Sequence, residues 1–230
     1  MFVDVSFDVR SDAGGKDPDS YSATLRSYHR YLWSKKLPNG KELILDEWLN
    51  NTSDACDFLF SSDSISNSLR GQKDYQYMIS QIDLDIIEDF VSKGSTIGGY
   101  VIFPKRKING KMSINQERGI NSRICDRFDL TLECIRLYYL DKDGPLHECF
   151  KRYHEFFDLF VDFKGYVDFF LLQDLVDENY NVRFFLPFYG FSFKPRPTNT
   201  EEYLLYKENT ISFVNSRNKR ISKWAYSEKR

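Results

Sequence analysis

The stretch Gly119–Leu140 combines the helical spacing of apolar residues with an unusual number of charges. Its apolar side chains recur at intervals of three and four, which is typical of a helix packed against a core. Leu130 and Leu137 fall on roughly the opposite side, so we expect this helix to be covered on two faces. Its charged residues are Arg123, Asp126, Arg127, Asp129, Glu133 and Arg136. Because an unpaired buried charge destabilises a fold by several kcal/mol, these side chains must pair with one another or serve a binding site.

The N-terminal segment alternates apolar and polar residues with a period of two. The apolar positions are Val3, Val5, Phe7 and Val9, and Asp8 and Arg10 are among the polar ones. This alternation predicts a half-buried strand. The loop AGGKDPDSY follows and contains Lys16 and Asp17. A polar strand face that runs into a Gly-rich loop is a common way to present ligand-binding groups.

Apolar periodicity predicts most of the remaining elements. We expect helices over residues 22–33, 42–50, 78–92, 145–160 and 199–217, and strands over 97–103, 111–115 and 182–188. The Asn109-Gly110 turn predicts that the strands on either side of it form a hairpin. Residues 165–176 are apolar on all sides and predict a central buried element, which periodicity alone does not identify as helix or strand.

The chain as a whole is predicted to be a single α+β domain over residues 1–230. Helices exceed strands, so we expect a helix-rich domain with a small, mostly antiparallel sheet. Residues 51–74 are rich in Ser, Asp and Asn, and we predict a mobile loop or insertion with one short helix there. We expect residues 218–230 to form a basic tail.

Composition narrows the classes of partner. The 32 basic and 34 acidic side chains nearly cancel, so nucleic acid is not favoured as a partner. No apolar run reaches the ~18 residues that span a bilayer, and no signal peptide is present, so no membrane association is expected. Four cysteines without a CxxC pair fit a reducing cytoplasm.

The charged residues predict a phosphate site. Arg118 would lie near the start of the charged helix, where backbone N–H groups favour an anion. The candidate phosphate-binding residues are Arg10, Lys16, Arg118, Arg123 and Arg127. Asp8, Asp17, Asp126 or Glu133 would act as a base or bind a hard cation such as Mg²⁺. The first hypothesis is therefore an enzyme for a nucleotide or another phosphate-bearing substrate, with its cleft between the N-terminal strand and loop and the Arg-rich helix.

Two alternatives remain open, so the sequence does not decide whether the chain is an enzyme. The same charges would also form a structural network, for example Arg136 with Glu133, in a non-catalytic module that binds a protein partner. A nuclease is the second alternative, because Asp19, Asp162 and Lys164 echo the residues of restriction-type nucleases. Their spacing is too long for that motif, and the near-neutral charge disfavours DNA.

Four other polar residues have structural interpretations. His29 falls on an apolar helix face, which is typical of a hydrogen-bonded core histidine. Asp168 lies alone in an apolar run, and we expect an arginine of the charged helix to pair with it. His147 and His154 are ~10 Å apart along a helix, too far to share a metal.

Four blocks of sequence resemble an uncharacterised bacterial family, a domain of unknown function. They are FDVRSDAGGKDPDSYSATLRSYHRYLWSKKLPNG at 7–40, TIGGYVIFP with INQERGIN, DRFDLTLECIR, and GYVDFFLLQDLV. The resemblance covers most of the chain outside 45–75 and the C-terminal tail. It implies a bacterial, soluble, single-domain protein, and it brings no activity or catalytic residue with it.

Overall fold

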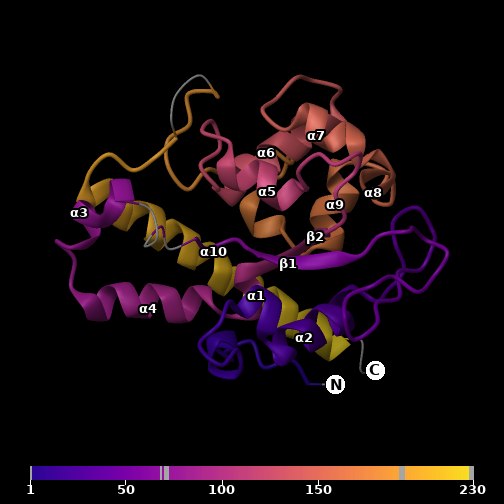
Figure 1. The fold of residues 1–230 in the computed structure, drawn as a ribbon, viewed down its shortest axis with the longest axis horizontal. Coiled ribbons are helices and arrows are strands. Elements are labelled where there is room, and N and C mark those ends of the chain that lie inside the picture. The colour runs from indigo at the N-terminus through magenta and orange to yellow at the C-terminus, as the bar shows by residue number, and fades with distance from the viewer. Residues whose placement is uncertain (1, 68, 70–72, 192–194, 228–230) are drawn as a thin grey trace.

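The computed structural model describes residues 2–67, 69, 73–191 and 195–227. Within these residues, about 49% of the chain is helical, and two strands form one antiparallel pair. The predicted α+β class with a small antiparallel sheet is therefore confirmed. In Figure 1 the long helix α10 (Thr200–Ser227) crosses the molecule diagonally, and the two strands pass over its middle.

The sheet joins two segments that are far apart in the sequence. Strand β1 (Phe60–Ser64) pairs with β2 (Tyr100–Pro104), in a register that places Ser64 opposite Tyr100. The predicted strand at 97–103 thus largely exists, but its predicted hairpin partner is wrong. Residues 114–120 instead form helix α5 (Ile114–Ile120), because Ser113 and Gln116 make a reciprocal capping box at its start.

Strand β1 lies inside the segment that was predicted to be a loop or insertion. Its sequence, FSSDS, lacks the β-branched residues that mark strands, and only Phe60 and Ser62 are buried in it. The described part of 51–74 contains no α-helix, and a short 3₁₀ helix (Lys73–Tyr75) begins at its end, while residues 68 and 70–72 lie outside the described part. The mobility of this segment stays a prediction.

The predicted N-terminal strand is wrong. Residues 2–8 pair with no strand, and Val9–Asp12 form a 3₁₀ turn in which the Asp8 side chain accepts a hydrogen bond from Arg10 N. Short acidic side chains that bond their own backbone compete with strand pairing, which explains the failure of the alternation rule. Helices α1 (Pro18–Tyr21) and α2 (Ala23–Trp33) follow, capped by the side chains of Asp17 and Ser22.

The charged stretch is two helices rather than one. Helix α5 ends at Ile120, and α6 (Phe128–Tyr139) begins after a short linker. Within that linker Cys125 and Asp126 have φ angles of 52° and 58°, a left-handed backbone that a continuous helix cannot contain. All residues from Phe128 to Ile135 are buried, so the expected cover on two faces is confirmed for α6.

The upper part of Figure 1 is a cluster of helices, and many aromatic side chains pack between them. It consists of α5, α6, α7 (His147–Arg152), α8 (His154–Asp158) and α9 (Phe163–Phe169). The rings of Phe150 and Phe157 lie 4.8 Å apart, and that of Tyr138 lies 5.0 Å from Phe157. The predicted helix over 145–160 is thus broken at Tyr153, and the apolar run 165–176 is α9 followed by a 3₁₀ turn.

Two further predicted elements are absent. Residues 42–50 form no helix and contain only isolated strand bridges such as Leu45 with Asn51. Residues 182–188 form no strand beyond one bridge between Val176 and Val182. The predicted helix over 78–92 is split into α3 (Gln76–Ile79) and α4 (Leu84–Gly94).

Helix α10 anchors the sheet through a buried arginine. Arg217 is fully buried and donates hydrogen bonds to the backbone oxygens of Phe170, Gly98 and Tyr100. A Cβ on Gly98 would lie 2.6 Å from Val214 O, so only glycine permits this contact. The helix continues through residues 218–227, which were predicted to be a tail. Among the described residues, no helix has the length and apolar character needed to cross a membrane.

Candidate functional site

A cleft of about 480 Å³ opens between the N-terminal loop, β1 and the linker before α6. Most of the charged side chains that line it are acidic. The polar residues of its wall include Arg10, Lys16, Asp17, Asp19, Asp63, Tyr100 and Asp126. Because carboxylates held near one another disfavour each other's ionisation, a buried carboxyl in such a cleft is expected to have a raised pKa.

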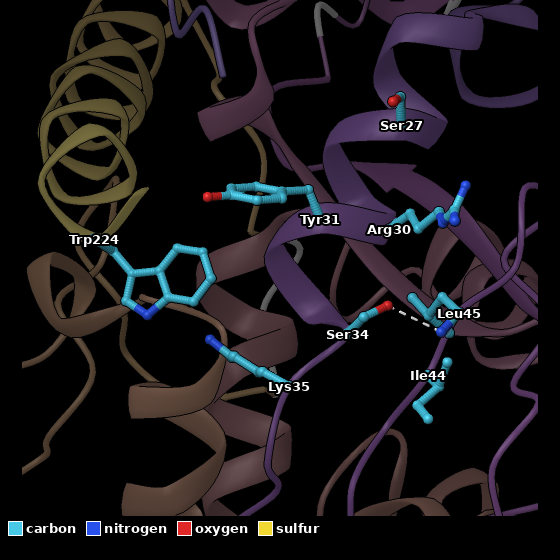
Figure 2. Close-up of a pocket in the computed structure, with 8 residues that line it drawn as sticks. All are labelled: Ser27, Arg30, Tyr31, Ser34, Lys35, Ile44, Leu45 and Trp224. Carbon is cyan, nitrogen blue, oxygen red and sulfur yellow. Dashed lines mark hydrogen bonds between the residues drawn. The ribbon is translucent and has the colours of Figure 1, made fainter. Parts of the chain in front are cut away.

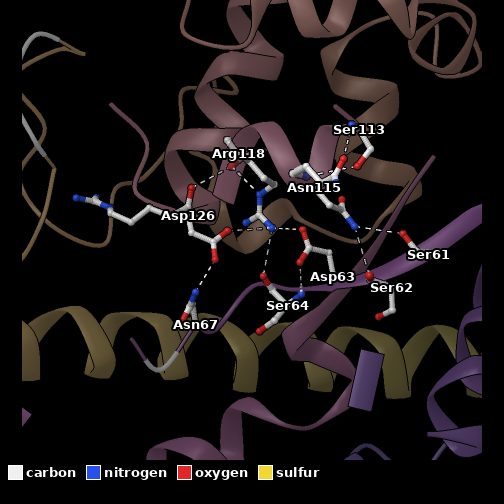
Figure 3. Close-up of polar contacts among 12 residues, drawn as sticks. Ser61, Ser62, Asp63, Ser64, Asn67, Ser113, Asn115, Arg118 and Asp126 are labelled. Carbon is white, nitrogen blue, oxygen red and sulfur yellow. Dashed lines mark hydrogen bonds and ion pairs between the residues drawn. The ribbon is translucent and has the colours of Figure 1, made fainter. Parts of the chain in front are cut away.

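A buried arginine lies beneath the cleft. Arg118 of α5 is fully buried, and Figure 3 shows its guanidinium between the carboxylates of Asp63 and Asp126. Its Nη1 forms an ion pair with Asp63 and lies 3.5 Å from Asp126 Oδ1. Its Nε donates to Thr131 Oγ1 at 3.2 Å, whereas Nη2 is buried without a hydrogen-bond partner among the described residues.

The acidic partners of Arg118 are held in place from other elements. Asp126 accepts a hydrogen bond from Asn67 Nδ2 at 2.5 Å, and Asn115 of α5 donates to Ser61 on β1 at 3.2 Å. Figure 3 shows these contacts tying α5 and the linker to the strand. Burial raises the pKa of Asp63, and the charge of Arg118 only partly offsets that effect. The arrangement fixes two carboxylates at the edge of the cleft.

Asp19 is the most unusual side chain of the cleft. Burial, followed by repulsion from Asp63 and Asp17, raises its pKa from 3.8 to about 7. Its Oδ1 atom is buried without a hydrogen-bond partner among the described residues. A carboxyl group with such a pKa exists in both protonation states at neutral pH and can therefore accept or donate a proton.

Sequence reasoning did not single out Asp19 as a catalytic residue. It was considered as part of a nuclease motif but not as a proton-transfer group, because Pro-Asp at a helix start is ordinary capping chemistry. Its raised pKa depends on β1, which brings Asp63 and Ser62 close to it. No local signal in the sequence predicts that contact.

The cleft brings together four of the residues predicted from the sequence. Arg10, Lys16 and Asp17 come from the N-terminal loop, and Asp126 comes from the linker. Arg10 is held by ion pairs with Asp8 at 2.5 Å and with Glu88 at 2.7 Å. Lys16 is exposed, and its ammonium group lies 4.6 Å from the centre of the Tyr21 ring.

The other predicted residues do not line this cleft. Asp8 caps the first turn and pairs with Arg10, and Arg118 lies underneath. Arg123 is exposed, and Glu133 pairs with Arg136 at 2.8 Å. The functional roles assigned to these residues from the sequence are not tested by their positions.

Arg127 belongs to a separate buried pair. Its guanidinium binds both carboxylate oxygens of Asp129 and donates to Pro195 O at 3.1 Å. Asp129 is fully buried and also accepts a hydrogen bond from Phe185 N at 2.9 Å. Arg127 touches a smaller cavity of about 230 Å³ on a different part of the surface.

A further pocket, of about 580 Å³, lies between α2 and the end of α10. Figure 2 shows Trp224 facing Tyr31 across it, with Lys35 pointing towards the indole ring. Lys35 donates to Phe169 O at 2.9 Å, and its ammonium group lies 4.7 Å from the centre of the Trp224 ring. No carboxylate and none of the sequence-predicted site residues lines this pocket, so the acidic cleft is the stronger candidate.

Two predictions about isolated polar residues have different outcomes. The expected arginine partner of Asp168 is wrong, because its carboxylate pairs with Lys164 and accepts from Gln173 at 3.0 Å. His29 is fully buried and hydrogen-bonded, as expected for a core histidine. Across the part of the chain that the structure describes, no three His, Cys, Asp or Glu side chains are grouped closely enough to hold a metal ion.

Comparison with known proteins places the chain in a family. A family model described as a family of unknown function, DUF6994, matches residues 3–221. No curated protein and no solved structure matches the chain. The match spans nearly the whole sequence, including every residue of the acidic cleft. The chain therefore belongs to the DUF6994 family of unknown function.

Proposed function

We propose that the protein is an enzyme that binds a nucleotide or another phosphate-bearing substrate in the acidic cleft, with Asp19 as its proton-transfer group. The observation that carries this proposal is the state of Asp19. Its Oδ1 is buried without a partner in the part of the chain that the structure describes, and its pKa is about 7. A buried acid that is not satisfied by the fold destabilises the native state, so its retention is typical of a functional site.

The neighbours of Asp19 support an acid–base role. Burial and then the charge of Asp19 raise the pKa of Tyr100, so its phenol stays protonated and can donate a hydrogen bond to a substrate oxygen. Asp63 and Asp126, neutralised in part by Arg118, complete a polar floor. A substrate hydroxyl or amine placed against Asp19 would meet both a proton acceptor and fixed dipoles.

The phosphate of the substrate belongs at the rim. Bare phosphate is repelled by the carboxylates of the floor, whereas Lys16 and Arg10 offer positive charge at the mouth. Lys16 is the better candidate, because Arg10 is already engaged by two acids. Mg²⁺ would reduce the repulsion if it enters together with the substrate phosphates. We further propose a bacterial setting, as the resemblance implies, and a cytoplasmic location, which four free cysteines support.

A binding screen tests the first half of the proposal. Nucleoside phosphates and sugar phosphates, each with and without Mg²⁺, are compared by thermal shift and then by calorimetry. We expect at least one class to stabilise the protein, and Lys16→Ala to weaken its binding by about tenfold. Arg123→Ala serves as the matched control, since Arg123 is an exposed cation outside the cleft. If no phosphate compound binds, the phosphate-bearing substrate is rejected.

A measurement of turnover tests the second half of the proposal, the role of Asp19 in proton transfer. With a bound substrate class in hand, Asp19→Asn is expected to keep the affinity and to lower the rate about 10²–10⁴-fold. The substitution preserves shape and removes only the exchangeable acid. An unchanged rate in Asp19→Asn would reject the role of Asp19.

A non-catalytic interaction module is the second candidate. It is favoured by the buried ion pair of Arg127 and Asp129 and by Arg217, whose charges are satisfied inside the fold. Exposed rings such as Tyr77, Tyr189 and Trp48 would supply a contact surface for a protein partner. Capture of one defined partner, lost on substitution of these rings and unaffected by Asp19→Asn, would favour this candidate. Nucleic-acid cleavage is weaker, because a net charge of −2 gives little attraction for DNA.

A further inference from the structure

A chain of buried hydrogen bonds runs from the core towards the cleft. His29 and Trp33 lie one turn apart on α2, and Ser62 lies on β1. Trp33 Nε1 is 3.0 Å from His29 Nδ1, and His29 Nε2 is 2.9 Å from Ser62 Oγ. All three residues are buried. Ser62 also lies close enough to Asp19 for its hydroxyl to lower the pKa of the Asp19 carboxyl.

The indole group fixes the direction of this chain. An indole N–H can only donate, so Nδ1 of His29 must be an acceptor and carries no proton. Burial, together with the positive charge of Arg217, lowers the pKa of His29 to about 3, so the ring is neutral at ordinary pH. A neutral imidazole carries one proton, which is therefore on Nε2. His29 donates that proton to Ser62 Oγ.

This direction excludes a serine nucleophile activated by His29. In a Ser–His pair of a hydrolase, Nε2 must be unprotonated so that it can take the proton of the serine. Here Trp33 Nε1 donates to Nδ1, the nitrogen that in a triad donates to an aspartate, and it imposes the opposite tautomer. Ser62 Oγ thus receives a hydrogen bond from the core and has its own hydrogen free for an acceptor on the other side.

We infer that Trp33, His29 and Ser62 are positioning residues that hold the Asp19 carboxyl by a one-way chain of hydrogen bonds from the core. The inference deepens the proposed function and rests on it for its catalytic meaning. The charged groups that act on Asp19 from the surrounding elements are Asp17, Asp63 and Arg118. The chain adds a neutral donor to this set, which stabilises the ionised form of Asp19 and leaves Oδ1 unengaged.

The tautomer of His29 can be measured without any substitution. Nitrogen NMR of the wild-type protein, labelled at histidine, distinguishes a proton on Nε2 from one on Nδ1. We expect a single neutral form with the proton on Nε2. A proton on Nδ1 would overturn the inference, because the chain would then run in the wrong direction.

The effect on Asp19 is measured by a carboxyl carbon NMR titration. Ser62→Ala removes the donor, so the pKa of Asp19 should rise by about one unit above its wild-type value. Ser61→Ala is the control, since it alters the next residue of β1 and Ser61 is not among the groups that act on Asp19. Trp33→Phe keeps a buried ring and removes only the indole donor, and should raise the pKa of Asp19 by a smaller amount. An unchanged Asp19 pKa in Ser62→Ala, with the amide spectrum of the folded protein preserved, would overturn the inference.

These titrations need no substrate, so the two proposals fail separately. Suppose that His29 has the expected tautomer, that Ser62→Ala raises the pKa of Asp19, and that the protein binds no phosphate compound. The chain of hydrogen bonds would then be supported and the proposed substrate rejected. If Asp19 is required for turnover but its pKa does not change in Ser62→Ala, the enzymatic function would be supported and the chain of hydrogen bonds rejected.

Discussion

Two buried arginine networks in this protein differ in what surrounds their carboxylates. Asp129, the partner of Arg127, is fully buried, and both of its oxygens are bound by the arginine. Asp63 and Asp126, the partners of Arg118, keep 19% and 22% of their side chains exposed and line a cleft. Among the described residues Arg118 Nη2 is buried without a partner, whereas neither Arg127 nor Asp129 leaves a buried polar atom unsatisfied.

This difference distinguishes an ion pair that only stabilises the fold from one that borders a candidate binding site. Both arginines are equally good phosphate ligands by sequence, since Arg127 lies in the charged stretch Gly119–Leu140 and Arg118 directly precedes it. A pair whose bonds are all formed within the fold has no capacity left for a ligand. A pair that borders a cleft and leaves a donor unused has such capacity, even if the fold is less stable for it.

The largest change in stability is expected at the pair of Arg127 and Asp129, whose hydrogen bonds are all formed within the fold. Arg127→Met leaves Asp129 buried without its counter-charge and should lower the free energy of unfolding by about 3–5 kcal/mol. The double variant Arg127→Met with Asp129→Leu should recover most of that loss, because the stranded charge is gone. Denaturant unfolding of the three proteins measures both values. A loss below about 1 kcal/mol in the single variant would show that this ion pair does not stabilise the fold as a buried pair should.

A smaller and pH-dependent loss of stability is expected at the network of Arg118, Asp63 and Asp126, which borders the cleft. Arg118→Met removes the charge that partly offsets the raised pKa of Asp63, so that pKa should rise further. A carboxyl whose pKa is higher in the folded than in the unfolded state binds more protons when folded, so stability falls as pH rises. We expect a loss of about 1–3 kcal/mol at pH 8 and a smaller one at pH 5. Equal losses at the two pH values would contradict this account.

Asp19→Asn should stabilise the protein at high pH. The folded pKa of Asp19, about 7, lies above its ordinary value of 3.8, so wild-type stability is reduced as pH rises through that window. Asparagine cannot ionise, and the gain at pH 8 should be on the order of 2 kcal/mol after allowance for solvent screening. Below about pH 4 the two proteins should be equally stable.

His29 also contributes to the pH dependence of stability, and this contribution is the same in wild type and in Asp19→Asn. The lowered pKa of His29, about 3, reduces stability as pH falls below its ordinary value of 6.5, which is the opposite trend. The difference between Asp19→Asn and wild type at each pH removes this contribution. A gain that is the same at every pH would mean that Asp19 does not carry a raised pKa.

The smallest effect is expected at the exposed pair of Lys164 and Asp168. Their side chains are 60% and 36% exposed, and such pairs contribute about 0.5 kcal/mol or less. Lys164→Ala should therefore change stability little, and added salt should abolish even that change. A loss comparable to that of Arg127→Met would show that burial does not decide the strength of these pairs.

The sequence predicted the features that depend on local patterns. The apolar spacing of Phe128, Leu132 and Ile135 predicted a buried α6, and the rule against unpaired buried charge predicted that Arg127 and Arg136 would have partners. The break at Cys125 and Asp126 was missed, because a left-handed linker leaves the same apolar spacing as a continuous helix.

The features that define the cleft depend on contacts between distant segments. Strand β1 pairs with β2 across about 40 residues, and FSSDS has no strand signature of its own. The pKa of Asp19 depends on that pairing, since Asp63 and Ser62 reach it from β1. The N-terminal alternation was misleading because Asp4 and Asp8 bond the backbone of Ser6 and Arg10. Four of the nine predicted site residues nevertheless line the cleft, because loop and linker polarity is visible in the sequence.

The most direct test of the open cleft is the proton affinity of Asp19 in the wild-type protein. A carboxyl carbon NMR titration, assigned with Asp19→Asn, reports this value without a ligand. The account predicts a midpoint near pH 7, well above the ordinary value of 3.8. A midpoint near pH 4 would show an ordinary solvated carboxylate and would contradict the assignment of this cleft as the functional site.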